Sequence, residues 1–344
     1  HKYSKIFLLK EIKFCYEEKI IMKLIFKEKE VNTVDEYFSA ISENYANETI
    51  IATNKIRKEV LKCIEEEKVP SIIDEDTLLY THAALLVAVS DNSELYPKAV
   101  AMLEKLIEKN NDPRALNELA ICYVLGRGVK QDKDKAFQLY EKAAKKGHAV
   151  AQCSLGLLYA FGKTRDKDKA FYWYKKSAKN GYAFAMNYLG NCYLYGIGVN
   201  KSKEDALYWY KKAARQGNNI AQSNLGRCYL MGEIVKQDYK KAFNLFKKSA
   251  AKYNIEAMFS LGCLYFEGKG TRKNAKKAID LWEQTAKFNH KGALYYLGVA
   301  YYEGKYVKRD LELAKSNLKK ASEQGIDEAT QLLDVIKKEE NTKK

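Results

Sequence analysis

Apolar and small residues recur at helical spacing through most of this chain. The segment KAFQLYEKAAKKG, residues 135–147, carries them at positions i, i+3, i+4 and i+7, which is the spacing of one face of an α-helix. The segment LAICYVLG, residues 119–126, lies before it and has the same period. The apolar patterns between residues 112 and 336 are all of this kind, so we expect helices and essentially no β-sheet there.

Together these two segments form a unit that is repeated six times. Its marker tyrosine falls at residues 123, 159, 193, 229, 265 and 301, with spacings of 36, 34, 36, 36 and 36 residues. An alanine stands four residues before the leucine of each unit, at residues 115, 151, 185, 221, 257 and 293. Ala329 begins a seventh copy of the first helix. A single helical hairpin cannot bury its apolar face alone, so the units must stack into a solenoid.

The glycines after each first helix have two interpretations. Gly196 and Gly198 form a Gly-x-Gly motif, but a phosphate-binding loop would follow a β-strand, and none is predicted here. The first glycine occurs in all six units, at residues 126, 162, 196, 232, 268 and 304, whereas Ile234 and Tyr306 replace the second one in two units. We therefore predict a left-handed helix cap at the first glycine.

Residues 185–217, AMNYLGNCYLYGIGVNKSKEDALYWYKKAARQG, carry the complete unit and resemble the Sel-one-like repeat (SLR) family, a branch of the tetratricopeptide-type (TPR) helical solenoids. The family pattern is approximately A-x-x-x-L-G-x-x-Y-x-x-G-x-G-V-x-x-D-x-x-K-A-x-x-W-Y-x-K-A-A-x-x-G, from which Ser202 and Asp205 depart. The resemblance recurs six times and covers residues 112–336. It implies an all-α fold, a right-handed α-solenoid of stacked helix-turn-helix repeats.

Three sites depart from the repeat. The second unit has lost two residues between Gly162 and Ala170, so a tighter turn is expected there. Tyr253 and Asn289 stand where the closing glycine of a unit is expected, and Asn tolerates a left-handed backbone better than Tyr.

We divide the chain into four parts. Residues 112–336 hold six SLR repeats and a C-terminal capping helix, and residues 337–344 are a charged tail. Residues 76–111 are interpreted as a degenerate N-terminal repeat, with helices in TLLYTHAALLVAVS and PKAVAMLEKLIEKNND, Ala99 in the place of Ala136 and Asn110 in that of Gly147. Residues 1–75 are expected to be helical, best in TVDEYFSAI and NKIRKEVLKCIEEEK, but their fold has no recognisable pattern.

Composition supports this division. The 344 residues are 47% apolar and contain only 3 prolines, which suits long helices joined by short turns. No run of apolar residues is long enough for a membrane span or a secretory signal. The chain opens at His1 without a Met, so we expect it to be a fragment or a processed form.

The net charge of +16 is unevenly distributed, with −4 in residues 1–111 and +20 in residues 112–344. Lysine pairs recur on the second helices, which in this architecture form the outer, convex wall, at 175/176, 211/212, 247/248 and 319/320. A solvated outer face explains them, and the alternative is an anionic partner such as a membrane surface or nucleic acid. Nucleic acid is the less favoured partner, because Trp173, Trp209 and Trp282 occupy core positions of the repeat and not base-stacking positions.

The polar residues do not form a catalytic or metal-binding motif. The carboxylates Asp132, Asp166 and Asp238 stand at helix starts and are expected to be caps. The four histidines lack the Cys/His spacing of a zinc site, and we predict no metal and no cofactor. Some secreted relatives in the SLR family join the two helices of a hairpin by a disulfide, but no second helix here carries a cysteine. We therefore expect seven free thiols and a cytoplasmic location.

The first helices carry the candidate binding residues. Counting from the alanine of each unit, positions 0, +4, +5 and +8 share one side of the helix, so positions +2, +3, +6 and +10 should face the concave surface. These positions differ from copy to copy on a constant frame, as they would on a surface fitted to one partner, although unconstrained drift would look the same. The candidates are Asn187, Tyr188, Asn191, Tyr195, Asn224, Arg227, Met231, Phe259, Glu267, Tyr295 and Tyr296, with Tyr302 at the edge.

These observations predict a non-catalytic scaffold or adaptor that binds another protein or peptide on its concave face. Two alternatives stay open. SLR arrays are sometimes joined to kinases or other catalytic domains, so the chain could be the regulatory arm of an enzyme whose catalytic part precedes His1. The basic outer wall could instead be a tether to anionic surfaces, whose binding would depend steeply on salt.

Overall fold

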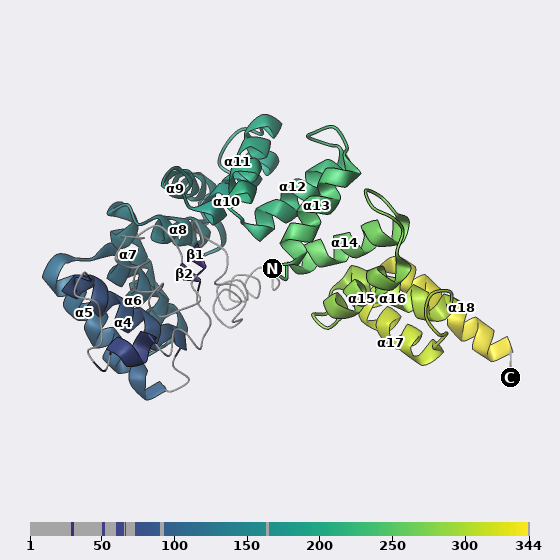
Figure 1. The fold of residues 1–344 in the computed structure, drawn as a ribbon, viewed down its shortest axis with the longest axis horizontal. Coiled ribbons are helices and arrows are strands. Elements are labelled where there is room, and N and C mark those ends of the chain that lie inside the picture. The colour runs from purple at the N-terminus through teal and green to yellow at the C-terminus, as the bar shows by residue number, and fades with distance from the viewer. Residues whose placement is uncertain are drawn as a thin grey trace. The chain divides into compact units, whose positions relative to one another are not determined.

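The computed structural model describes residues 29–30, 50–51, 60–64, 66, 73–89, 93–162 and 165–342 (Figure 1). The chain divides into two compact units, residues 1–218 and 219–344, which we call the N-terminal and C-terminal units. Each unit is described by itself below.

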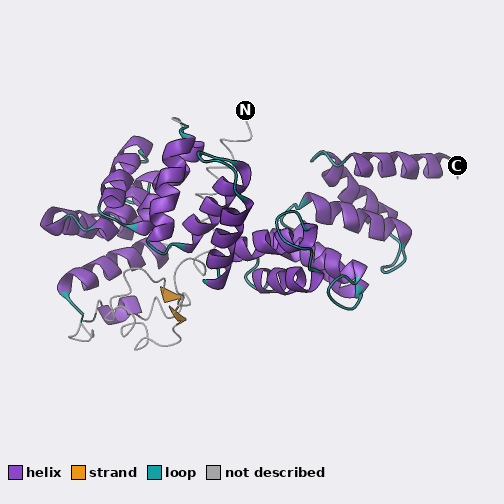
Figure 2. Cartoon of the chain, turned by 90° about the horizontal axis from the view of Figure 1, so that it is seen from above, coloured by secondary structure: helices purple, strands orange, loops and turns teal. Residues whose placement is uncertain are grey.

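From residue 75 onward, the described residues form helices joined by short turns (Figure 2). Helices α4 (Glu75–Val89) and α5 (Tyr96–Asn110) come first, with the short 3₁₀ helix η2 (Ser93–Leu95) between them. The repeats of the N-terminal unit follow as the pairs α6 (Pro113–Leu125) and α7 (Lys133–Lys145), α8 (Ala149–Phe161) and α9 (Lys167–Lys179), and α10 (Ala183–Tyr195) and α11 (Lys203–Arg215). The C-terminal unit holds the pairs α12 (Asn219–Met231) and α13 (Tyr239–Ala250), α14 (Ile255–Glu267) and α15 (Ala275–Ala286), α16 (Lys291–Glu303) and α17 (Leu311–Ser322), and the final helix α18 (Asp327–Thr342).

The N-terminal residues correct one expectation. Strands β1 (Lys29–Glu30) and β2 (Ile50–Ile51) form a parallel pair, so residues 1–75 are not all helical. A pairing of two residues is too short to leave a period in the sequence. Residues 60–64 are helical, within the predicted segment NKIRKEVLKCIEEEK, whereas TVDEYFSAI lies outside the described residues.

The two helices of a repeat approach each other at a glycine of the first helix, which directly follows the leucine that recurs in each unit. In α10 this residue is Gly190, where a Cβ atom would lie 2.7 Å from the ring of Tyr210 in α11. A Cβ atom would likewise lie 2.7 Å from Tyr174 at Gly156, 2.9 Å from Phe246 at Gly226, 2.6 Å from Trp282 at Gly262 and 2.5 Å from Leu318 at Gly298. The glycine therefore lets a large buried side chain of the second helix lie directly on the first.

The marker tyrosines join one repeat to the next. Tyr193 of α10 lies edge-on to Phe171 of α9, with ring centroids 5.5 Å apart. Tyr159 contacts Phe137 at 5.6 Å, and Tyr265 contacts Phe243 at 5.2 Å, in the same way. These tyrosines are packing residues, and their recurrence in every unit follows from the stacking of the repeats.

Side-chain caps begin all six second helices. Asp132, Asp166, Ser202, Asp238, Asn274 and Asp310 each accept a hydrogen bond from a backbone N–H of the first turn. The N–H of Lys169 is the main reason that the pKa of Asp166 lies below its ordinary value. The predicted capping role of the carboxylates is thereby confirmed.

The predicted left-handed cap is found in five of the six units. Gly196 has φ 72° and ψ 46°, and Gly126, Gly232, Gly268 and Gly304 also have positive φ. Gly162 differs, with φ −72° and ψ −168°, because the two missing residues of this turn require an extended backbone. A Cβ atom there would lie 2.2 Å from the Leu158 carbonyl oxygen, so the position still requires glycine.

The second glycine of the Gly-x-Gly motif contacts the preceding repeat. A Cβ atom on Gly198 would lie 2.2 Å from the carbonyl oxygen of Lys167, the first residue of α9. A Cβ atom on Gly270 would lie equally close, at 2.2 Å, to the carbonyl oxygen of Tyr239 at the start of α13. The motif is therefore a turn that permits close packing of repeats, as predicted.

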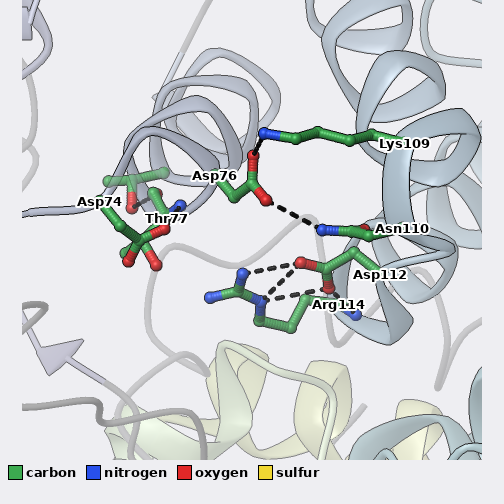
Figure 3. A network of polar contacts seen from close by, with 8 residues as sticks. Asp74, Asp76, Thr77, Lys109, Asn110, Asp112 and Arg114 are labelled. Atoms are coloured by element: carbon green, nitrogen blue, oxygen red, sulfur yellow. Dashed lines mark hydrogen bonds and ion pairs between the residues drawn. The ribbon is translucent and has the colours of Figure 1, made fainter.

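Polar contacts join α4 to α5 and fix the start of α6 (Figure 3). Asp76 accepts hydrogen bonds from Lys109 at 2.6 Å and Asn110 at 3.0 Å. The buried Asp112 caps α6 and accepts from the Arg114 guanidinium at 2.7 Å. Burial raises the pKa of Asp112, but the hydrogen bonds and charge of Arg114 outweigh it and bring the pKa below its ordinary value.

Helices α4 and α5 lie where the degenerate repeat predicts its two helices. Its closing turn differs in one detail, because Asn111, with φ 56°, has the left-handed backbone and Asn110 still belongs to the helix. α5 thus runs one residue further than the alignment to Gly147 implies. The assignment of residues 76–111 as a repeat stays a prediction.

Candidate interaction surface

The first helices expose three of the four positions that were predicted to face a partner. Position +2 is buried in the first four repeats, as Asn117, Cys153, Asn187 and Ser223. Positions +3, +6 and +10 are partly or fully exposed in most repeats. We call the surface formed by these three positions, together with the partly exposed Phe259 and Tyr295 at position +2 of the last two repeats, the first-helix face.

In the N-terminal unit, the four predicted residues of α10 have different surroundings. Asn187 is only 1% exposed, so its side chain is not available to a partner. Tyr188 stacks on Tyr174 of α9, with centroids 5.1 Å apart and an interplanar angle of 17°. Asn191 accepts a hydrogen bond of 2.5 Å from the Tyr210 hydroxyl, and Tyr195 is 54% exposed at the end of the helix.

In the C-terminal unit, α12 presents a polar pair and an apolar tip. Arg227 is exposed and donates a hydrogen bond of 3.3 Å to the side chain of Asn224, one turn earlier. Met231, at the last residue of the helix, is 57% exposed. A cation and a flexible apolar side chain therefore lie on the same face of α12.

The rings of α14 and α16 form a connected cluster. Tyr296 stacks on the buried Trp282 at 4.9 Å and contacts Phe259 at 5.9 Å and Tyr295 at 5.5 Å. Phe259 in turn lies 4.5 Å from the ring of His290, whose Nε2 is 3.3 Å from Glu256. Tyr296 thus has one face on the core and retains an exposed part of its ring.

Two predicted residues have neighbours within the chain. Tyr302 donates a hydrogen bond of 2.5 Å to Glu339 of the final helix, so it serves the C-terminal cap as well as the edge of the face. Exposed Glu267 pairs with Lys269 at 2.6 Å. The residues that are brought together in the C-terminal unit are therefore Phe259, Tyr295 and Tyr296, while Tyr302 is partly engaged elsewhere.

The family follows from the repeats themselves. The sequence profile of the Sel1 repeat matches residues 113–148, 149–182, 183–218, 219–254, 255–287 and 292–326, which is more than half of the chain. This chain belongs to the Sel1 repeat family. Proteins of this family typically bind other proteins. Only Sel1 repeats were found in it, and no catalytic domain was identified.

Solved structures agree with the family match. The chain is similar to a protective antigen present in uropathogenic Escherichia coli strains that displays an SLR fold, with 26% identity and a TM-score of 0.61 over 89% of this chain and 67% of that one. It is also similar to a Sel1 repeat protein from Oxalobacter formigenes, with 30% identity and a TM-score of 0.60 over 67% of this chain and 97% of that one. A comparison with curated proteins gave no match. The all-helical solenoid of stacked helix pairs is thereby confirmed.

Of the thiols that the structure describes in this Sel1 repeat protein, those of Cys122, Cys153, Cys192 and Cys228 are buried, and those of Cys63 and Cys263 are partly exposed. No disulfide joins the described cysteines, which are Cys63, Cys122, Cys153, Cys192, Cys228 and Cys263, and Cys15 lies outside the described residues. Burial raises the pKa of Cys122 and of Cys192 to about 12 and that of Cys228 to about 11. Such thiols are poor nucleophiles and poor metal ligands.

In the described part of the chain, no three His, Cys, Asp or Glu side chains converge as metal ligands would. Nor has any helix there the length and apolar character of a bilayer crossing. Two of the scattered histidines have a structural role that the sequence did not reveal. His148 and His290 are the N-cap residues of α8 and α16, and each accepts, through Nδ1, a hydrogen bond from a backbone N–H of the first turn.

Glu118 is a residue of the first-helix face that sequence reasoning missed. It occupies position +3 of the first Sel1 repeat, and its carboxylate accepts a hydrogen bond of 3.3 Å from Asn117. Burial raises its pKa to about 7. Its place in the repeat could have indicated the face, but the depth of its burial depends on neighbouring helices.

Proposed function

We propose that this Sel1 repeat protein is a non-catalytic adaptor that binds a partner protein or peptide on its first-helix face. The exposed, varied side chains of that face, held on a constant repeat frame, are the observation that supports this function. In the C-terminal unit the contact residues are Asn224, Arg227, Met231, Phe259, Glu267, Tyr295 and Tyr296. In the N-terminal unit they are Tyr188, Asn191 and Tyr195.

The aromatic cluster supplies the anchor of this proposal. Tyr is enriched among the residues that dominate binding energies, because it offers a wide apolar body and a hydrogen-bonding tip. Tyr296 is supported from below by Trp282 at 4.9 Å, so little side-chain freedom is left to lose on binding. Arg227 and Glu267 add charges of opposite sign on the same unit, which would orient a partner.

Affinity purification with mass spectrometry tests the proposal. Proteins retained by the wild type are compared with those retained by Met231→Asp and by the double variant Tyr295→Ala, Tyr296→Ala. We expect both variants to lose the same partner. For the tyrosine pair, the binding free energy should weaken by about 2 kcal/mol or more. Met231→Asp removes an exposed side chain without emptying the core, so it separates lost contact from lost folding.

The double variant Lys247→Ala, Lys248→Ala is the control. These lysines are exposed on the second helix α13, and we expect their replacement to change the affinity for the partner little at physiological salt. Helix content is measured by circular dichroism for every variant. Retention of all partners by both face variants, with helix content unchanged, would show that the first-helix face is not the binding surface.

A further inference from the structure

The second helices of repeats two and three, α9 and α11, carry matching stripes of one tyrosine and three cations. The residues stand at positions i, i+3, i+4 and i+7, so each stripe lies on one face of its helix. We call them the α9–α11 stripes: Tyr172, Lys175, Lys176 and Lys179 on α9, and Tyr208, Lys211, Lys212 and Arg215 on α11. The other four repeats have no tyrosine at this position and carry Gln138, Asn244, Asp280 and Ser316.

Both tyrosines are exposed, Tyr172 at 48% and Tyr208 at 56% of their surface. Exposed apolar groups that gather on one face commonly mark a site of interaction. Their counterparts in the other repeats are polar, so packing of the solenoid does not require a ring there. The two stripes lie in adjacent repeats of the N-terminal unit, and their tyrosines are 36 residues apart, one repeat.

The six cations of the stripes are not neutralised within the described part of the chain, where no carboxylate lies within ion-pair distance of any of them. Elsewhere the chain does neutralise such residues. Lys145 on α7 pairs with Glu141 at 3.2 Å, and Lys315 on α17 pairs with Glu312 at 2.6 Å and Glu340 at 2.9 Å. The stripes therefore present a concentrated positive charge beside two exposed rings.

The geometry of the rings helps to decide what kind of anion fits. Tyr172 and Tyr208 each lie edge-on to the neighbouring Trp173 or Trp209, with centroids 5.1 Å apart. The ammonium of Lys176 lies over the ring of Tyr172 at 4.8 Å. A single-stranded nucleic acid needs open ring faces on which its bases stack, and here one such face is covered by a cation. A planar anionic surface needs only the rims of the rings and the lysine ammonium groups.

We propose that the α9–α11 stripes bind the surface of a bilayer that contains anionic phospholipids. Tyrosine is favoured at the interface between headgroups and hydrocarbon, where its hydroxyl stays hydrated. Lysine and arginine near such a surface are attracted by about 1 kcal/mol each. This contact uses second helices only, so it is separate from the first-helix face and does not depend on the proposed function.

Co-sedimentation with vesicles tests the proposal, using phosphatidylcholine vesicles with and without phosphatidylserine. We expect the wild type to bind only the vesicles that contain phosphatidylserine, and binding to fall steeply as salt is raised. The double variant Lys211→Gln, Lys212→Gln should weaken this binding at least about tenfold. The double variant Tyr172→Asn, Tyr208→Asn, which introduces the residue that repeat four carries as Asn244, should also weaken it while the net charge is unchanged.

The matched control is Lys247→Gln, Lys248→Gln, which removes the same charge from α13, where Asn244 stands in place of the stripe tyrosine. We expect less than about a twofold loss from it, because only lysines near the bilayer contribute. An equal loss from both lysine pairs, or no loss from the tyrosine pair, would reduce the effect to net charge and overturn the proposal. The proposal would also be overturned if the protein bound neither kind of vesicle, or if it bound a single-stranded oligonucleotide more tightly and through the tyrosines.

Discussion

At the scale of single residues, the backbone of Tyr253 is the clearest departure from the repeat. It has φ 57° in a position that other units fill with glycine, at residues 147, 181, 217 and 325. A Cβ atom on Gly147, Gly181 or Gly325 would meet nothing within 4 Å, so space does not select glycine there. The cost of Tyr253 therefore lies in its left-handed backbone and not in a clash.

Replacing Tyr253 by Gly should raise the free energy of unfolding by about 0.5 to 1 kcal/mol, because the relief of left-handed strain exceeds the added flexibility of the unfolded chain. Thermal melts or urea titrations measure it. The control is Asn289→Gly, at φ 59°, which should gain less because Asn tolerates this backbone. A lower melting temperature for Tyr253→Gly would mean that the exposed ring contributes more than the strain costs.

The carboxyl group of Glu118 should make the stability of the protein depend on pH. Its pKa rises from an ordinary 4.5 to about 7 because folding buries the carboxyl group. The folded protein therefore holds a proton that the unfolded chain releases, and stability falls as pH rises from 4.5 through 7. Glu118→Gln, which stays neutral, should melt higher than the wild type at pH 8 and by a smaller margin at pH 5. A margin that is the same at both pH values would contradict the buried, titrating carboxyl.

At the scale of helices, the period of apolar residues predicted the six hairpins, and the glycine after each first helix predicted six left-handed turns, of which five are found. It did not predict that position +2 is buried, as Asn187 shows, while Tyr195 at position +10 is exposed. The helical period states the direction of a side chain on its own helix, but the depth to which a neighbouring helix covers it depends on the spacing between repeats. The extended backbone of Gly162 was missed for a related reason, since a shortened turn has no equivalent in the other units.

The close approach of Gly190 to Tyr210 allows a test of how tightly the two helices of a hairpin are packed. Gly190→Val should destabilise the protein by about 2 kcal/mol, because the added atoms must push aside a ring that is fully buried. The first repeat offers the control, since Ala120 occupies this position opposite Tyr140, and Ala120→Gly should cost no more than about 1 kcal/mol of helix propensity. Denaturant titrations followed by circular dichroism measure both, and an unchanged midpoint for Gly190→Val would show that the helices can separate freely.

At the scale of the whole molecule, the repeat separates folding from binding. The residues that recur at constant spacing, such as Gly190, Tyr193 and Tyr210, are buried or packed between helices. The residues that differ between copies lie on the two outward surfaces, Met231 on a first helix and Tyr208 on a second helix. Because these surfaces belong to different helices, their variants should act independently. We expect the double variant Lys211→Gln, Lys212→Gln to bind vesicles more weakly and to retain the protein partner. Met231→Asp should lose the partner and retain vesicle binding.

The distribution of cysteines allows a last prediction about the whole chain. Cys122, Cys192 and Cys228 occupy the same place in three first helices, and burial raises their pKa values to about 12, 12 and 11. These shifts lower the population of the reactive thiolate by about a thousandfold for Cys122 and Cys192 and about a hundredfold for Cys228, so iodoacetamide at pH 8 should label these residues slowly in the folded protein. In denaturant without reductant, all seven cysteines should be labelled rapidly, as mass spectrometry of peptides would show. Fast labelling in the folded state would mean that the first helices separate from their neighbours more often than their packing implies, whereas recovery of a disulfide-linked peptide would overturn the assignment of free thiols.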